Sequence, residues 1–130
     1  MNWNALYLVL LAMGGCSSGP SEPSQDVPLG QEFTLKPGES AAIQSTGLQV
    51  SFREVVDDSR CPADVVCVWA GDAVVALEVG SAAVELRSNS APETSVGAYR
   101  IRLERVEPYR YSDRAIAPGD YRAVLKVTRP

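Results

Sequence analysis

Asp72 to Arg87 reads DAVVALEVGSAAVELR, in which apolar residues alternate with small or charged ones. Such alternation predicts half-buried β-strands, because successive side chains of a strand point to opposite faces of the sheet. Gly80-Ser81 interrupts the pattern with residues that are typical of a tight turn. The stretch therefore predicts an antiparallel hairpin whose first strand has one apolar face: Ala73, Val75, Leu77 and Val79.

The same period of two recurs along the chain, in LQVSF (48–52), YRIRL (99–103) and DYRAVLKVT (120–128). Shorter apolar pieces at QEFTL and SAAI flank the turn sequence KPGE, and no segment shows a helical period. About seven such strands predict an all-β domain over residues 30–130, a single antiparallel β-sandwich of immunoglobulin-like type. The closing run APGDYRAVLKV resembles the last strand of secreted immunoglobulin-like modules, where Tyr121 is either a core residue or a hydrogen bonder.

The N-terminal residues indicate an export signal. Ala5 to Met13 is an apolar run too short to span a bilayer, and Gly14, Gly15 and Cys16 follow it. This resembles the lipobox of bacterial lipoproteins, which implies a signal peptide over 1–15 and acylation of Cys16, with the lipid bilayer as partner. Ser17 after the cysteine implies the outer membrane rather than the inner one. The alternative is an ordinary cleaved signal.

Residues 16–29 contain SSGPSEPSQDVP, which has almost no apolar side chains and several prolines and serines. Such a composition predicts a flexible tether, because it offers too little apolar surface to order itself. Fully extended, it would reach roughly 35–40 Å at about 3.1 Å per residue.

Charge is distributed unevenly along the chain. Residues 16–97 carry 4 basic and 12 acidic residues, whereas residues 98–130 carry 8 basic and 4 acidic. A basic segment can bind a polyanion. The arginines Arg100, Arg102 and Arg122, however, alternate with apolar residues, and such a pattern is typical of a solvated sheet face opposite acids such as Glu78 or Glu85. We therefore expect no nucleic-acid partner.

The residue inventory limits the chemistry. The chain has no histidine, and its two methionines, Met1 and Met13, lie in the predicted signal peptide. Histidine-based acid–base catalysis is thereby excluded, and a domain without these ligands is a poor host for copper, zinc or haem. Four acids could offer oxygen ligands to calcium, but their spacing matches no calcium loop: Asp57, Asp58, Asp64 and Asp72. We expect no catalytic residues, no metal and no cofactor.

Cys61 and Cys67 remain after lipidation of Cys16, and outside the cytoplasm they should pair. A disulfide closing so short a loop contributes roughly 2–2.5 kcal/mol by chain entropy. The surrounding DSRCP and CVWAG segments resemble small bacterial lipoproteins, a likeness that carries no function with it. The spacing C-x5-C is similar to the active pair in the immunoglobulin-like periplasmic domain of the transmembrane thiol:disulfide reductase, which implies a redox relay as the alternative.

Trp69 leaves two arrangements open. If residues 70–72 form a bulge that preserves the alternation, Cys67 and Trp69 face the core together, as in the disulfide–tryptophan contact of immunoglobulin domains. A buried disulfide of that kind is inert. If Gly71 instead marks a turn that resets the register, neither side chain need face inward.

The longest connections between predicted strands, 57–72 and 110–115, form the expected binding rim, because loops at one end of a sandwich carry most binding sites. The candidate rim residues are Asp57, Asp58, Arg60, Asp72, Tyr109, Arg110, Tyr111 and Arg114. The sequence thus predicts a membrane-anchored, extracytoplasmic, non-enzymatic binding or structural module with an unknown protein or envelope partner. The alternative is a periplasmic thiol–disulfide exchange module that uses Cys61 and Cys67.

Overall fold

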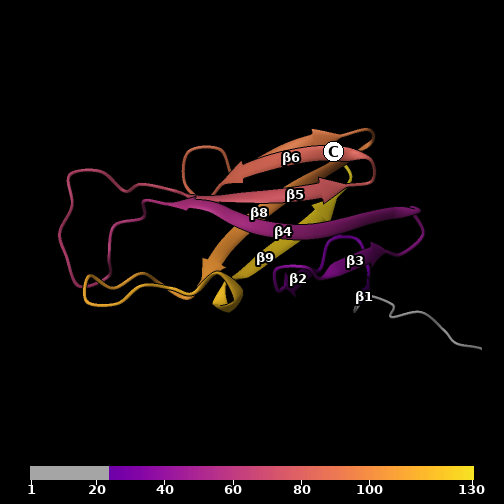
Figure 1. Cartoon of the computed structure of the whole chain (residues 1–130). Helices are drawn as coiled ribbons and strands as arrows, with labels where there is room; N and C mark the ends of the chain where they lie inside the picture. Colours follow the sequence, from indigo (N-terminus) through magenta and orange to yellow (C-terminus); the bar gives the residue numbers. More distant parts are fainter. Residues whose placement is uncertain (1–23) are drawn as a thin grey trace, which may run out of the picture.

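The computed structural model describes residues 24–130, which form nine strands and one short 3-10 helix (Figure 1). The elements are β1 (Ser24–Val27), β2 (Glu32–Leu35), β3 (Ser40–Ile43), β4 (Leu48–Asp58), β5 (Ala73–Val79), β6 (Ala82–Arg87), β7 (Glu93–Val96), β8 (Tyr99–Glu107), η1 (Pro118–Asp120) and β9 (Arg122–Thr128). The predicted signal peptide, Cys16 and most of the predicted tether lie outside the described residues. No helix among residues 24–130 is long and apolar enough to cross a membrane.

The strands form a five-stranded sheet in the order β1-β3-β4-β5-β6 and a four-stranded sheet in the order β2-β9-β8-β7. Each sheet is built mainly from strands consecutive in the chain that pair antiparallel. The exception is β1, which runs parallel to β3 because the chain crosses to the second sheet as β2 between them. β1 falls within the range 16–29 predicted as tether, so pairing begins before residue 30.

One apolar core fills the space between the two sheets, and it confirms the predicted β-sandwich. The apolar face predicted for the 72–87 hairpin is fully buried, as are the inward residues of β4, β8 and β9. Gly80 and Ser81 form the expected turn between β5 and β6. The sandwich has nine strands rather than about seven, because β1 and β7, with the sequences SQDV and ETSV, are short and mostly polar and show no apolar alternation.

Two irregularities change which residues face the core. In β8 the register shifts between Leu103 and Arg105, so that Leu103 and Val106, three positions apart, are both buried. In β4 two shifts follow Phe52, and Val56 is left half exposed. A bulge inserts an extra residue and reverses the alternation beyond it.

The expectation that arginines of the basic C-terminal segment face Glu78 or Glu85 is wrong. Those acids lie on β5 and β6 of one sheet, whereas the arginines lie on the other sheet. Glu78 instead pairs with Arg53, and Arg102 pairs with Glu93 across β7 and β8 at 3.3 Å. Arg102 is thus paired within its own sheet.

Candidate functional site

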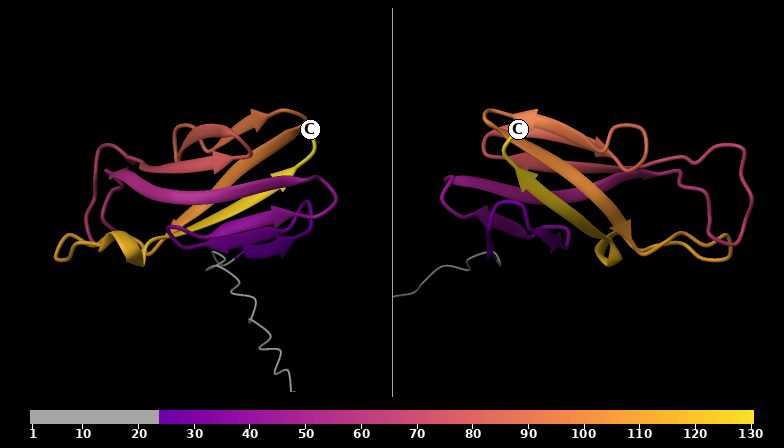
Figure 2. Two further views of the ribbon diagram at one scale, coloured as in Figure 1. Left: turned by 45° about the vertical axis from the view of Figure 1, so that its right-hand side comes forward. Right: turned by 180° about the vertical axis from the view of Figure 1, so that it is seen from behind.

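Two long connections project together from one end of the sandwich (Figure 2). They are residues 59–72, between β4 and β5, and residues 108–117, between β8 and η1, and we call them the apical loops. The Ala63 amide donates to the Arg110 carbonyl at 2.8 Å, which joins the two loops directly. The structure therefore brings together the two segments predicted to form a rim.

The stem of the first apical loop continues the β4–β5 ladder. The Ser59 amide donates to the Asp72 carbonyl at 2.8 Å, and the Cys61 amide donates to the Ala70 carbonyl at 2.9 Å. Gly71 has φ of 68°, and a Cβ there would lie 1.8 Å from the Ser59 carbonyl oxygen. Only glycine permits this close approach of the two stem backbones.

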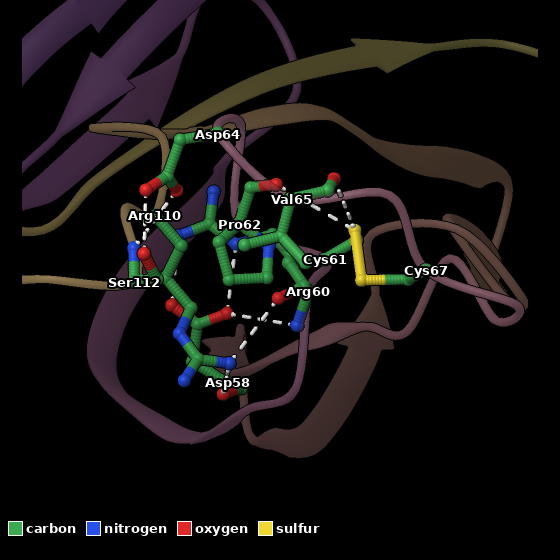
Figure 3. The surroundings of a disulfide bond; sticks show 9 residues. All are labelled: Asp58, Arg60, Cys61, Pro62, Asp64, Val65, Cys67, Arg110 and Ser112. Atoms are coloured by element: carbon green, nitrogen blue, oxygen red, sulfur yellow. Dashed lines mark hydrogen bonds and ion pairs between the residues drawn. A yellow bond between two sulfur atoms is a disulfide. The ribbon is translucent and has the colours of Figure 1, made fainter.

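The Asp58 carboxylate is the centre of a network beneath the loops (Figure 3). It accepts hydrogen bonds from Arg60 Nε at 2.8 Å, from Arg60 Nη2 at 2.7 Å and from the Tyr121 hydroxyl at 2.9 Å. Arg60 also donates to the carbonyls of Val106 at 2.7 Å and Pro108 at 3.0 Å. The Asp58 and Arg60 side chains are only 8% and 12% exposed, so this ion pair is largely shielded from water.

Two further contacts fasten the loops to each other. Arg110 Nη1 donates to the backbone carbonyls of Asp58 at 3.1 Å and Arg60 at 3.2 Å. The Asp64 carboxylate accepts hydrogen bonds from the Ser112 amide, at 2.9 Å, and from the Ser112 hydroxyl. The bonds at Arg60 and Asp64 join the first apical loop to the second, and the bond to the Asp58 carbonyl joins the second loop to the end of β4. The two loops therefore form one supported unit.

Asp72 connects the same loop to the β6–β7 turn. Its carboxylate accepts from the amides of Asn89 at 2.7 Å and Ser90 at 2.8 Å, and from the Ser90 hydroxyl at 2.8 Å. A carboxylate distant in sequence thereby satisfies two backbone amides of this turn. Asp72 therefore has a structural role at the base of the loop.

The protonation behaviour of these acids follows from their partners. Burial works to raise the pKa of the Asp58 carboxyl, but hydrogen bonds from Arg60 and Tyr121 and the Arg60 charge leave that pKa below its ordinary value. Hydrogen bonds from Ser112 lower the pKa of Asp64. Burial and the bond to Asp58 raise the pKa of Tyr121 to about 12. All of these groups keep their usual charge at neutral pH.

Cys61 and Cys67 form the predicted disulfide, with 5.9 Å between their Cα atoms. The bond closes the outer part of the first apical loop, and Cys67 is exposed while Cys61 is partly buried. The Val65 carbonyl oxygen lies 3.3 Å from Cys61 Sγ, folded back over the bond (Figure 3). The ring is thus compact, and it lies at the surface.

The inward arrangement of Cys67 and Trp69 is wrong. Trp69 is 81% exposed and Cys67 is exposed, because both belong to the apical loop that projects beyond the end of the sandwich (Figure 2). Trp69 belongs to a group of exposed apolar side chains that we call the apolar tip: Val65, Val66, Val68 and Trp69. Val66 and Val68 are 100% and 92% exposed.

The predicted rim residues divide into two groups. Four of them are at least partly buried and contribute to the network or the base of the loops: Asp58, Arg60, Asp72 and Arg110. The other four lie on the surface: Asp57, Tyr109, Tyr111 and Arg114. Arg114 stacks over the Tyr111 ring at 5.0 Å from its centroid. Only the second group is available to a partner.

The four acids considered as calcium ligands do not converge. Asp58, Asp64 and Asp72 each direct their oxygens to different protein donors, and residues 24–130 contain no group of three or more potential metal ligands. Each of these three carboxylates instead holds a loop or turn in place.

Two contributions were missed by sequence reasoning. Tyr121, just before β9, donates a hydrogen bond from its hydroxyl to Asp58. The sequence left Tyr121 open as either a core residue or a hydrogen bonder, and it did not indicate Asp58 as the partner. The apolar tip gave a usable signal, since residues 65–71 contain no charged side chain although they lie in a long connection. Such a run in a loop indicates either burial or a docking surface, and the sequence left the orientation of Trp69 open between an inward and an outward position.

Comparison with protein-family models, with curated proteins and with solved structures gives no match to this chain.

Proposed function

We propose that this protein is an extracytoplasmic, membrane-anchored lipoprotein whose domain acts as a non-enzymatic binding or structural module, with Cys61–Cys67 as a structural disulfide. The observation that supports this most strongly is the apolar tip, which is exposed to water yet held by a disulfide and a supported loop. Large apolar side chains grouped on a surface mark interaction sites.

The support beneath the tip favours binding over a purely structural role. Arg60 and Arg110 direct their guanidinium groups inward to backbone carbonyls, and Asp64 joins the loops from the side. A loop fixed in one conformation loses little entropy when it binds. The network therefore prepares the tip for contact without taking part in it.

The cysteines support the extracytoplasmic location that we propose. A disulfide persists in oxidising surroundings outside the cytoplasm. The apolar run that ends at Gly14-Gly15-Cys16 provides the route there and the acylation site. Two or three acyl chains hold a protein on a bilayer essentially permanently.

Lipidation is tested by expressing the chain in a diderm bacterium with a clickable palmitate analogue, beside a Cys16→Ser variant. The proposal predicts labelled protein in the outer-membrane fraction and loss of the label in the variant. Equal labelling of both chains, or soluble wild-type protein, would contradict it. The Cys61→Ser/Cys67→Ser double variant is the matched control and should keep the label.

Thiol–disulfide exchange is the second candidate, because Cys67 is an exposed residue and exchange needs a disulfide that a thiolate can reach. A relay also needs a cation that lowers the pKa of one thiol. Arg60, the nearest arginine in the sequence, is engaged by the Asp58 carboxylate and by two carbonyls. The structural disulfide is therefore the better supported reading.

An insulin reduction assay with dithiothreitol separates the two candidates. A structural disulfide predicts that the wild-type chain and the Cys61→Ser/Cys67→Ser variant leave the rate of insulin precipitation equally unchanged. A relay predicts acceleration by the wild-type chain alone.

A further inference from the structure

We propose that the apolar tip inserts into the interfacial layer of a zwitterionic bilayer, as a second and reversible membrane contact beside the acylated Cys16. This inference rests on the proposed function, since the lipid anchor is what brings a bilayer within reach. The tip would then fix how the domain lies on the membrane surface.

The first argument is the shape and chemistry of the tip. It lies at the outer end of a loop that projects beyond the sandwich, so it is convex and suited to entering a soft surface (Figure 1). Residues 65–71 carry no charge, so no ionised group has to leave water with them. Val66, Val68 and Trp69 are together the most exposed large apolar side chains of the described domain.

The second argument is the composition of the second apical loop, which is joined to the first at Ala63 and Asp64. It exposes Tyr109, at 67%, and Tyr111, at 41%. Tryptophan and tyrosine concentrate at membrane–water interfaces, where the ring is apolar and its polar atom stays wet. Arg114, stacked on Tyr111, can extend its guanidinium to phosphate oxygens.

Charge selects the kind of bilayer. The apical loops, residues 59–72 and 108–117, contain three aspartates and three arginines, so they carry no net positive charge. An anionic surface attracts basic segments. Loops without net positive charge gain no such attraction, so the tip is suited to the zwitterionic surfaces of phosphatidylcholine or phosphatidylethanolamine.

The loop backbone limits the depth of insertion. The Val65 amide donates to the Pro62 carbonyl at 3.1 Å, whereas the amides of residues 66–69 have no partner within the described domain. Unpaired amides are excluded from hydrocarbon but are satisfied by water and headgroups. Insertion consequently stops at the interface.

Position on the fold makes the two contacts distinct. Ser24 at the start of β1 pairs with Ser40 of β3, and Ser40 pairs in turn with Ser51 of β4. Ser51 lies seven residues before the end of β4. Two bulges shorten this span, since Ser51 pairs with Glu78, which lies only five residues from Ala73 at the loop end of β5. At about 3.3 Å per residue, β1 therefore begins roughly 17 Å from the base of the apical loops. Attachment at both places would hold the sandwich along the membrane, and the anchor would raise the effective lipid concentration at the tip.

The experiment uses the full chain with Trp3→Phe, which leaves Trp69 as its one tryptophan. Phosphatidylcholine vesicles, with plain or brominated acyl chains, are added while tryptophan emission is recorded. The N-terminal apolar run can bind lipid itself, so a readout local to Trp69 is essential. The control moves the tryptophan to the far end of the sandwich, in a Trp3→Phe/Trp69→Phe/Ser81→Trp chain.

The proposal predicts a blue shift and quenching by brominated lipid for Trp69, and neither for the control chain. Val66→Ser/Val68→Ser should weaken the response about tenfold, from the lost apolar contact, with an unchanged urea midpoint. No shift for Trp69, an equal shift for the control, or a stronger response to phosphatidylglycerol vesicles would overturn it. A tip that docks on a protein gives the first of these results. Loss of acylation in the palmitate assay would instead refute the proposed function, independently of the Trp69 signal.

Discussion

Replacing Asp58 by alanine tests the network beneath the apical loops. The substitution removes the one carboxylate that faces Arg60, and it removes the acceptor of the Tyr121 hydroxyl. Arg60 stays in place, 12% exposed, with its charge compensated only by the carbonyls of Val106 and Pro108. An ionised group is thereby left largely buried without a counter-charge.

Breaking a buried ion pair by removing one partner costs about 3–5 kcal/mol. Arg60 keeps its two carbonyl acceptors in Asp58→Ala, so we expect the loss of unfolding free energy to lie at the lower end of this range, about 3 kcal/mol. Domains of this size have total stabilities of about 5–15 kcal/mol, so the loss is a large share. With a urea m-value of about 1.5 kcal/mol/M, the midpoint should fall by roughly 2 M.

The assay is urea unfolding at pH 7, followed by far-UV circular dichroism. Asp113→Ala is the matched control, because Asp113 pairs with Arg114 at 3.3 Å while both side chains are about 70% exposed. That variant should leave the midpoint nearly unchanged. Asp58→Ala/Arg60→Met should be more stable than Asp58→Ala alone, because it also removes the uncompensated charge. The reasoning is refuted if Asp58→Ala shifts the midpoint no more than the control does.

Three other outcomes follow from the same structure. Gly71→Ala should lower the free energy of unfolding by about 2 kcal/mol or more in urea, because the new Cβ would overlap the stem backbone. Gly97→Ala has open space around its Cβ and should lose only about 1 kcal/mol, from its positive φ. Equal losses in the two variants would contradict this. Cys61→Ser/Cys67→Ser should lower the free energy of unfolding by about 2 kcal/mol. Its circular dichroism spectrum should remain that of a folded protein, since the disulfide lies outside the core. An unfolded spectrum in native buffer would contradict this. The pKa of Asp58 is lower in the folded state than its ordinary value of 3.8. Ionised Asp58 therefore stabilises the fold above about pH 4, and this stabilisation is lost as the pH falls through the folded pKa. Between pH 5 and pH 3 the urea midpoint should drop less in Asp58→Asn than in the wild type.

The regular part of the fold was predictable because one physical rule governs it. A strand with one buried face must alternate, and 73–79, 99–103 and 121–127 do so with few exceptions. The disulfide was predictable as well, because two cysteines near each other in a domain with a predicted export signal have few alternatives.

The parts that escaped prediction depend on contacts distant in sequence. The strand β1 has the mostly polar sequence SQDV, which carries no strand signal of its own. It is a strand because its backbone pairs with β3. The exposure of Trp69 depends on where the sandwich ends, because the stem of the first apical loop carries this residue beyond the second sheet. The Asp58–Tyr121 bond spans 63 positions and has no local signature.

The reduction potential of the Cys61–Cys67 pair tests the central claim most directly. It is measured on the Cys16→Ser chain equilibrated against glutathione buffers, with the thiols trapped and counted by mass spectrometry. A structural disulfide that holds the tip for binding predicts a potential below about −300 mV. A potential between about −120 and −230 mV, with the sandwich folded in both states, would contradict this account and place the protein among thiol–disulfide exchange modules.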